Sequence, residues 1–160
     1  ARESIFNLLI NGGYGNPLAG ARVLDVFAGT GALGLEALSR GAAQAVFLEN
    51  GPAALAILQR NIKLMRAEER TGILRRDALK PGLNPGAGFD LVFLDPPYGK
   101  QMGEVALAAL AGWLTPQALG IWEENAPPVV PSGFDRLDQR KYGDTFVTIL
   151  QAETPPAASV

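Results

Sequence analysis

The sequence predicts an α/β fold: a Rossmann-like, doubly wound and mostly parallel sheet with a C-terminal antiparallel hairpin. Short apolar runs alternate with helical stretches up to residue 124, the pattern of parallel strands joined by crossover helices. Most of these runs place Val, Ile, Leu and Phe at both strand parities, as strands covered on two faces require. A chain of 160 residues suits one core. We therefore expect a single domain over 1–152 and a flexible tail over 153–160.

Each element has a local signal. Strands are expected at 21–28, 45–49, 71–76, 89–95 and 119–124. Helices are expected at the N-terminus and at 31–41, 52–70 and about 102–113. Gly41 is typical of a C-terminal cap and Pro52 of a first helical turn. Four apolar residues recur at helical spacing after Pro52 and predict that helix's buried face: Ala54, Leu58, Ile62 and Met65.

After residue 133 the sequence alternates charged and apolar residues around "YGD". Gly143 and Asp144 supply the turn chemistry of a hairpin between two half-buried strands. We expect this hairpin to close one edge of the sheet.

Composition excludes several kinds of chemistry. The chain has no His and no Cys, which removes disulfides and most zinc, haem and catalytic-triad sites. We expect no metal, and catalysis by carboxylates, hydroxyls, backbone groups or an imported cofactor. No apolar run approaches the ~18 residues of a membrane span, and no export signal opens the sequence. We expect a cytoplasmic protein, away from membranes, whose true start precedes Ala1 because the sequence does not begin with Met.

The stretch "LDVFAGTGALGLEALSRG" carries a G-x-G-x-x-G pattern, formed by Gly29, Gly31 and Gly34, between a strand and a helix. Glu49 follows Gly29 by twenty residues, where it could accept both hydroxyls of a ribose. Asp25 would repel the pyrophosphate of a nicotinamide cofactor but suits the ammonium and sulfonium of S-adenosylmethionine. The pattern therefore favours S-adenosyl-L-methionine as the ligand. The alternative is a tight turn in which Asp25 only caps the loop.

Asp77 follows the expected third strand, where it could accept a hydrogen bond from the donor's adenine amine. It suits a solvent-facing loop residue equally well. The candidate donor-binding residues are Asp25, Phe27, Gly29, Gly31, Glu49, Asn50, Asp77 and Ala78.

The stretch "FDLVFLDPPYGK" ends a strand in one carboxylate and two prolines. Because ligands bind at the carboxyl ends of parallel strands, Asp95 should emerge beside the donor. Pro96 and Pro97 stiffen the backbone, so Asp95 and the Pro96 carbonyl could hold the hydrogens of a nucleobase amine while Tyr98 stacks on the base. The candidate catalytic residues are therefore Asp95, Pro96, Pro97 and Tyr98. The alternative is a Pro-rich turn in which Tyr98 covers the core.

"FAGTGALGLEALSRGA" and "FLDPPY" closely resemble the bacterial 16S ribosomal RNA guanine-N2 methyltransferases (RsmD-like), and "RESIFNLL" resembles the segment before their cofactor fold. The resemblance covers Arg2 to about Gln151 and implies a class I methyltransferase fold. It implies that Asp25, Gly29 and Gly31 line the methionine part of the donor, Glu49 holds the ribose, Asp77 meets the adenine, and residues 95–98 form the target-base site. It also implies that Arg2 and Phe6 close over donor or substrate.

The sequence departs from the family at two places. Relatives carry a basic, hairpin-forming stretch before the "RESIF" position that the printed sequence lacks. Many also carry an acidic residue where this chain has Gly51.

The partner implied is ribosomal RNA or an assembling small subunit, met by a monomer. Residues 60–80 hold seven basic and three acidic residues although the formal net charge is −2, so five of these cations are a candidate phosphate-binding face: Lys63, Arg66, Arg70, Arg75 and Arg76. Three alternatives stay open: an adenine-N6 methyltransferase of DNA or RNA, a dehydrogenase-like nucleotide-binding module, and a non-catalytic RNA-binding scaffold.

Overall fold

The computed structural model describes residues 2–153, which fold around one seven-stranded sheet. The helices are α1 (Arg2–Asn11), α2 (Ala32–Ser39), α3 (Pro52–Leu64) and α4 (Met102–Ala109), with short 3₁₀ turns η1 (Glu68–Arg70) and η2 (Ala111–Trp113). The strands are β1 (Arg22–Val26), β2 (Gln44–Leu48), β3 (Thr71–Leu74), β4 (Phe89–Leu94), β5 (Leu114–Glu124), β6 (Phe134–Tyr142) and β7 (Thr145–Ala152).

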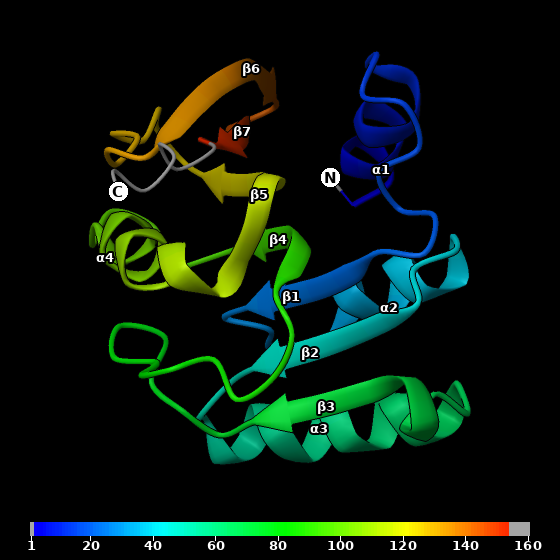
Figure 1. The fold of residues 1–160 in the computed structure, drawn as a ribbon. Coiled ribbons are helices and arrows are strands. Elements are labelled where there is room, and N and C mark those ends of the chain that lie inside the picture. Colours follow the sequence, from blue (N-terminus) through cyan, green and yellow to red (C-terminus); the bar gives the residue numbers. More distant parts are fainter. Residues whose placement is uncertain (1, 154–160) are drawn as a thin grey trace, which may run out of the picture.

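The sheet has the order β3-β2-β1-β4-β5-β7-β6 (Figure 1). Strands β1 to β5 pair in parallel, whereas β7 runs antiparallel to β5, and β6 antiparallel to β7. This confirms the predicted doubly wound sheet and its C-terminal hairpin, whose turn falls at Gly143 and Asp144. Residues 154–160 of the predicted tail lie outside the described residues, while the Glu153 amide donates to the Gly133 carbonyl at 2.9 Å.

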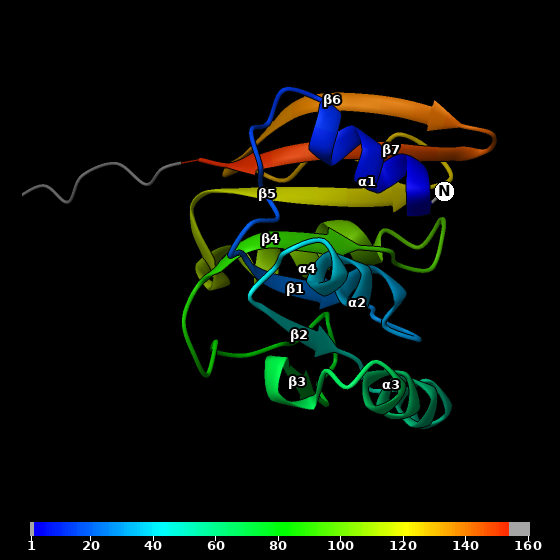
Figure 2. The same cartoon turned by 90° about the vertical axis from the view of Figure 1, so that its right-hand side faces the viewer.

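Helices cover both faces of the sheet. Figure 2 shows α1, α2 and α3 on one face, and their apolar side chains share one buried cluster with residues of β1, β4 and β5. The opposite face packs against α4 and η2 in a second cluster. Strands β1, β2 and β4 are buried at nearly every position, so the expectation that both parities are covered is confirmed.

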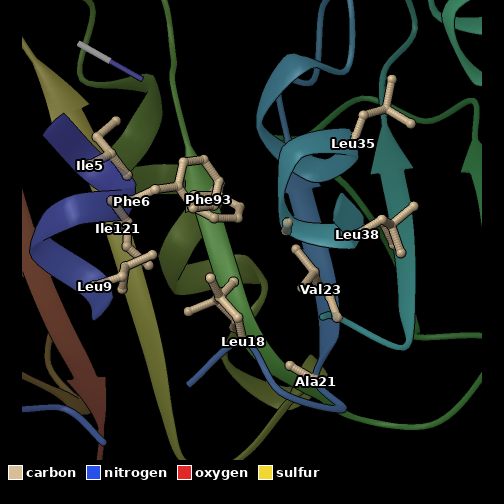
Figure 3. Close-up of a cluster of buried hydrophobic side chains, with 14 of the residues drawn as sticks. Ile5, Phe6, Leu9, Leu18, Ala21, Val23, Leu35, Leu38, Phe93 and Ile121 are labelled. Carbon is tan, nitrogen blue, oxygen red and sulfur yellow. The ribbon is translucent and has the colours of Figure 1, made fainter. Parts of the chain in front are cut away.

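The N-terminal helix packs directly on the centre of the sheet. Ile5, Phe6 and Leu9 face β4 and β5 (Figure 3), and the ring centroids of Phe6 and Phe93 lie 5.6 Å apart. Phe6 is fully buried, so the expectation that it closes over a ligand is wrong. Burying a phenyl ring against β4 is worth about 1.5–3 kcal/mol, which a mobile cover would give up.

The helix predicted at 52–70 is shorter than expected. It ends at Leu64 because Arg66 takes a left-handed conformation with φ 52°, and the Ala67 amide then donates to the Ile62 carbonyl at 3.0 Å, a Schellman-type closure. Of the four residues predicted to form its buried face, only Leu58 and Ile62 are buried, while Met65 is 46% exposed. The early stop lets the chain turn back so that β3 pairs with β2.

The region after α4 also differs from prediction. Helix α4 ends at Ala109 and β5 begins at Leu114 rather than at residue 119. Pairing with β4 is irregular there, since the register moves from Phe89 opposite Leu114 to Leu91 opposite Leu119. Pro116 lies in this segment and cannot donate to the ladder, which explains why sequence patterning placed the strand start after it.

No helix in residues 2–153 is both long enough and apolar enough to cross a bilayer.

Helix α4 depends on a glycine at its contact with β5. A Cβ atom at Gly103 would lie 2.6 Å from the Trp122 indole, which is fully buried. We expect Gly103→Ala to lower the free energy of unfolding by about 1–3 kcal/mol through overpacking, measured by urea denaturation. Gly112→Ala in η2 is the matched control, because no atom lies within 4 Å of its Cβ position. Equal unfolding midpoints for the two variants would contradict the packing argument.

Candidate functional site

A cavity of about 640 Å³ opens at the carboxyl ends of the parallel strands. Its walls come from segments directly after β1, β2, β3 and β4, the place where ligands bind in open α/β sheets. The lining residues are Phe27, Leu48, Glu49, Asn50, Arg76, Asp77, Ala78, Leu79, Asp95, Pro96, Pro97 and Met102. The volume falls within the range of small-molecule sites, about 300–1,000 Å³.

The glycine turn lies behind this cavity rather than in its lining. Gly29 and Gly31 have φ values of 57° and 80°, a region that favours glycine. A Cβ atom at Gly31 would lie 2.4 Å from Leu58, and one at Gly34 would lie 2.5 Å from the Phe47 ring. The glycines thus allow a tight turn into α2 and close packing of α2 against β2. A direct contact of Gly29 or Gly31 with a donor stays a prediction.

Glu49 ties the glycine turn to the end of β2. Its Oε1 accepts a hydrogen bond from the Gly29 amide at 2.8 Å, and its Oε2 accepts from the amides of Asn50 at 3.0 Å and Gly51 at 2.8 Å. A carboxylate has about four lone-pair sites, so roughly one remains for a ligand. Glu49 lines the cavity, and to hold both ribose hydroxyls, as predicted, it must share or exchange one of these amide bonds.

Asp25 is buried on β1, with 1% of its surface exposed, and does not line the cavity. Its Oδ2 accepts a hydrogen bond from the Gly34 amide at 2.9 Å, so it anchors α2, as the capping alternative proposed. Burial raises the pKa of Asp25 to about 8; the Gly34 hydrogen bond opposes this, and the nearby carboxylates of Asp95, Glu49 and Glu123 add to it. Its contact with the donor's ammonium stays a prediction.

The loop after β3 supplies the opposite wall. The Asp77 Oδ1 accepts from the Leu79 amide at 2.9 Å, which forms a local turn and places Asp77 and Ala78 on the cavity. Arg76 donates through Nη1 to the carbonyls of Pro81 at 2.8 Å and Leu83 at 2.9 Å. Arg76 therefore holds this loop and lines the cavity, instead of belonging to an open cationic face as predicted.

Asp95, Pro96 and Pro97 line the same cavity directly after β4. Partial burial raises the pKa of Asp95 above its usual value, against a hydrogen bond from Glu123 that lowers it. Tyr98 is 44% exposed and lies outside the lining, so its ring is open to a partner instead of covering the core. Arg2 lines a separate groove beside Thr30 and Asn61.

Sequence reasoning missed several residues of the site. Leu48, Leu79 and Met102 form apolar wall from three separate segments, and no short motif joins them. Glu123, buried at the end of β5, has its carboxyl within hydrogen-bonding reach of Asp95. The sequence signal for Glu123 was a charged residue inside an apolar strand, "LGIWEE".

The site fits a cationic, adenosine-sized ligand. Apolar wall residues sit beside the carboxyl groups of Glu49, Asp77 and Asp95, with Asp25 buried close behind. Arg76 is the one cationic side chain among the lining residues found in the described part of the chain, and its Nη1 is committed to backbone carbonyls. Such a site favours a ligand that brings positive charge.

Comparisons with known proteins identify the family to which the chain belongs. A family model described as "Conserved hypothetical protein 95" matches residues 1–151. The chain is similar to "Ribosomal RNA small subunit methyltransferase D" of Escherichia coli K12, with 33% identity over 157 residues that cover 95% of this chain and 76% of the relative. A relative of the same name from Haemophilus influenzae is 32% identical over 160 residues, covering 94% and 79%. A solved structure of a conserved hypothetical protein from Streptococcus pyogenes superposes with a TM-score of 0.79 at 36% identity, covering 96% of each chain.

Asp25 should make stability depend on pH. Its pKa rises from about 3.9 in the unfolded chain to about 8 in the fold, so the folded state holds the proton more tightly. The stability this confers is complete below about pH 4 and is lost as pH rises through about 8, at about 1.4 kcal/mol per pKa unit. We expect the free energy of unfolding of wild type to fall by several kcal/mol relative to Asp25→Asn between about pH 5 and about pH 8.

Urea denaturation at the two pH values measures this difference. Asp135→Asn on the exposed edge strand β6 is the control for loss of a carboxyl group, and its pH dependence should parallel that of wild type. Parallel curves for wild type and Asp25→Asn would show that Asp25 is not desolvated.

Proposed function

The chain belongs to the family described as Conserved hypothetical protein 95, and from that premise we propose that it transfers a methyl group from S-adenosyl-L-methionine to the N2 amine of a guanine in small-subunit ribosomal RNA. Its relatives are named as ribosomal RNA small subunit methyltransferases, so the resemblance found in its motifs is confirmed and the chain is a ribosomal RNA methyltransferase. The target atom is the proposed part. The observation that supports an exocyclic amine as the target is the arm Asp95-Pro96-Pro97 on the cavity that Glu49 also lines, while the choice of guanine N2 rests on the resemblance of the glycine segment to the guanine-N2 enzymes.

The residues that would hold the donor are those around the ends of β1, β2 and β3. Glu49 and Asn50 would meet the ribose, Asp77 and Ala78 the adenine, and Asp25 with the glycine turn the methionine end. When bound, the donor supplies an electrophilic methyl group on a positively charged sulfur. The carboxyl groups around the cavity complement that charge.

Asp95 and the Pro96 carbonyl would hold the target amine. An exocyclic amine is a weak nucleophile because its lone pair is delocalised into the ring, and two acceptors on its hydrogens favour the localised lone pair. Pro96 and Pro97 restrict the backbone that carries both acceptors. The two acceptors are therefore already ordered before the reaction, and little conformational entropy is lost in the transition state. Once alkylated, the nitrogen becomes strongly acidic and releases a proton to the Asp95 carboxylate or to water, so no histidine is needed.

The substrate is proposed to be naked ribosomal RNA or an assembling small subunit, bound by a monomer in the cytoplasm. Lys63, Arg66, Arg70 and Arg75 are exposed along the end of α3, η1 and β3. These four, which we call the basic face, lie toward the β3 edge of the sheet. Arg75 follows β3 on the side of the cavity, whereas Lys63, Arg66 and Arg70 precede β3 at the opposite end of the strand, so the basic face could contact phosphates away from the target base. Tyr98, exposed next to the Pro97 wall, could stack on the target base.

Asp95→Ala tests the catalytic assignment. We expect methyl transfer to fall by about 10²–10³-fold, while binding of S-adenosylhomocysteine, measured by calorimetry, largely survives because Glu49 and Asp77 are untouched. Asp90→Asn is the matched control, since Asp90 is an exposed carboxylate at the other end of the same strand, where it accepts from the Arg22 amide. It should react at the wild-type rate.

Methyl transfer is measured on naked small-subunit RNA, assembled small subunits and duplex DNA, and the product nucleoside is identified by mass spectrometry. N2-methylguanine on RNA or subunits supports the proposal. Activity on duplex DNA alone, or N6-methyladenine as the product, overturns the choice of target. Full activity of Asp95→Ala overturns the mechanism, and absence of S-adenosylhomocysteine binding overturns the donor.

The basic face makes a separate prediction about salt. Each phosphate contact contributes about 0.7–0.9 to the slope of log affinity against log salt. We expect the triple variant Lys63→Ala/Arg66→Ala/Arg70→Ala to make the slope shallower by about 2, measured by fluorescence anisotropy on small-subunit RNA. The control Arg136→Ala/Lys141→Ala removes exposed cations from β6 at the opposite sheet edge. An unchanged slope in the triple variant would remove the basic face from the interface.

A further inference from the structure

Glu123 is a buried carboxyl group one residue before the end of β5, next to the catalytic arm. Leu94 pairs with Trp122 in the parallel ladder between β4 and β5. The residues that follow them in the chain, Asp95 and Glu123, therefore lie side by side. Glu123 is only 8% exposed. Its carboxyl lies within hydrogen-bonding reach of the Asp95 carboxyl.

Strand alternation fixes the face on which Glu123 lies. Ile121 packs in the cluster under α1 and α2, whereas Trp122 packs in the cluster under α4. Because side chains alternate along a strand, Glu123 points to the α1 and α2 face. Asp25 lies on that same face of β1, since Val23 belongs to the α1 and α2 cluster. Three neighbouring strands thus bring three carboxyl groups together: Asp25, Asp95 and Glu123.

Ion pairs do not neutralise these carboxyl groups in the described part of the chain. The ion pairs found within residues 2–153 are Arg40 with Glu36 and Arg140 with Asp138, and neither involves the three. The partner of Glu123 on β7 is Val147, which carries no ionisable group. Two adjacent carboxylates repel each other, most strongly where one of them is buried as Glu123 is, and the lower-energy arrangement keeps one proton between them.

The retained proton is placed on Glu123 because Glu123 is buried, whereas Asp95 is exposed, and burial disfavours the charged form. Burial, the charge of Asp95 and the hydrogen bond to Asp95 together raise the pKa of Glu123 to about 7. The same hydrogen bond lowers the pKa of Asp95, as expected when Asp95 is the acceptor. The neighbouring Glu124 does something different: its Oε2 accepts from the Trp122 indole at 3.1 Å on the other face of the strand.

We propose that Glu123 is a positioning residue for the target-amine site: its protonated carboxyl donates a hydrogen bond to the Asp95 carboxylate and fixes the oxygen that accepts from the base. The role rests on the proposed function, because it acts through Asp95. It also keeps the Asp95 and Glu123 pair at a single negative charge. Loss of the Glu123 proton at higher pH replaces the bond by repulsion and turns the Asp95 carboxylate away from its productive orientation.

Carboxyl titration by carbon NMR tests the bond itself, without any requirement for activity. In wild type, the Glu123 carboxyl should titrate near neutral pH. In Asp95→Ala it should titrate at clearly lower pH, because the repelling and hydrogen-bonding partner is gone. Glu124→Gln is the control and should leave the Glu123 titration in place. A Glu123 titration that is the same with and without Asp95 overturns the inference.

Single-turnover methyl transfer at saturating donor tests the positioning role. In Glu123→Gln the side-chain amide can still donate a hydrogen bond to Asp95 but cannot ionise. We expect its rate of methyl transfer to stay within a few-fold of the wild-type rate at about pH 6.5. We also expect this variant to lack the fall in rate that wild type shows as pH rises above about 7. Glu123→Ala should lose about 10–100-fold in rate with S-adenosylhomocysteine binding retained. Thermal unfolding confirms that both variants are folded.

The outcomes separate this inference from the proposed function. A wild-type protein that transfers no methyl group to any nucleic acid overturns the proposed function, and the positioning role with it. An active wild type in which Glu123→Ala keeps its rate, or in which Glu123→Gln keeps the wild-type decline at high pH, overturns only the role of Glu123.

Discussion

The register of the parallel strands is the constraint on which the site depends. Asp25 pairs with Phe47 on one side and with Phe93 on the other, and Leu94 pairs with Trp122. These backbone pairings bring Glu49, Asp95 and Glu123 to one edge, each from the end of a different strand. A one-residue slip would turn every side chain to the opposite face, so buried apolar residues on both faces fix the geometry of the carboxyl groups.

Carboxyl groups placed this close to one another repel when ionised, and burial adds a desolvation cost. The fold offsets these costs differently at each group. Glu49 accepts three backbone amides, which stabilise its negative charge. Asp25 accepts a single amide, from Gly34, which does not offset its burial, so its pKa is raised. Asp95 and Glu123 share a hydrogen bond. Burial is the main cause that raises the pKa of Asp25, Asp95 and Glu123.

Local patterning predicted the sheet, the hairpin and the loop positions of Glu49, Asp77 and Asp95, because strand parity and turn chemistry are encoded by adjacent residues. It failed where the answer depends on distant segments. The family resemblance implies that Phe6 covers a ligand, and the sequence shows no local sign against this because the partner of Phe6 in the fold, Phe93, is 87 positions away. Local sequence predicts Arg76 to be a surface cation. The backbone carbonyls that accept its hydrogen bonds belong to a loop whose sequence has no recognisable motif. The register in which β4 pairs with β5 likewise cannot be predicted from a short motif, because it depends on contacts between distant segments.

The absence of histidine follows from the kind of proton transfer the proposed chemistry needs. A general base with a pKa near 7 is useful when a proton must leave before or during bond formation. An amine that becomes cationic on alkylation is strongly acidic, so even a weakly basic carboxylate such as Asp95 suffices to accept its proton. What the reaction requires instead is an acceptor held in one orientation next to a positively charged donor. Prolines on one side of Asp95 and a buried carboxyl on the other meet that requirement with backbone rigidity and charge, which explains how the proposed reaction can proceed without histidine.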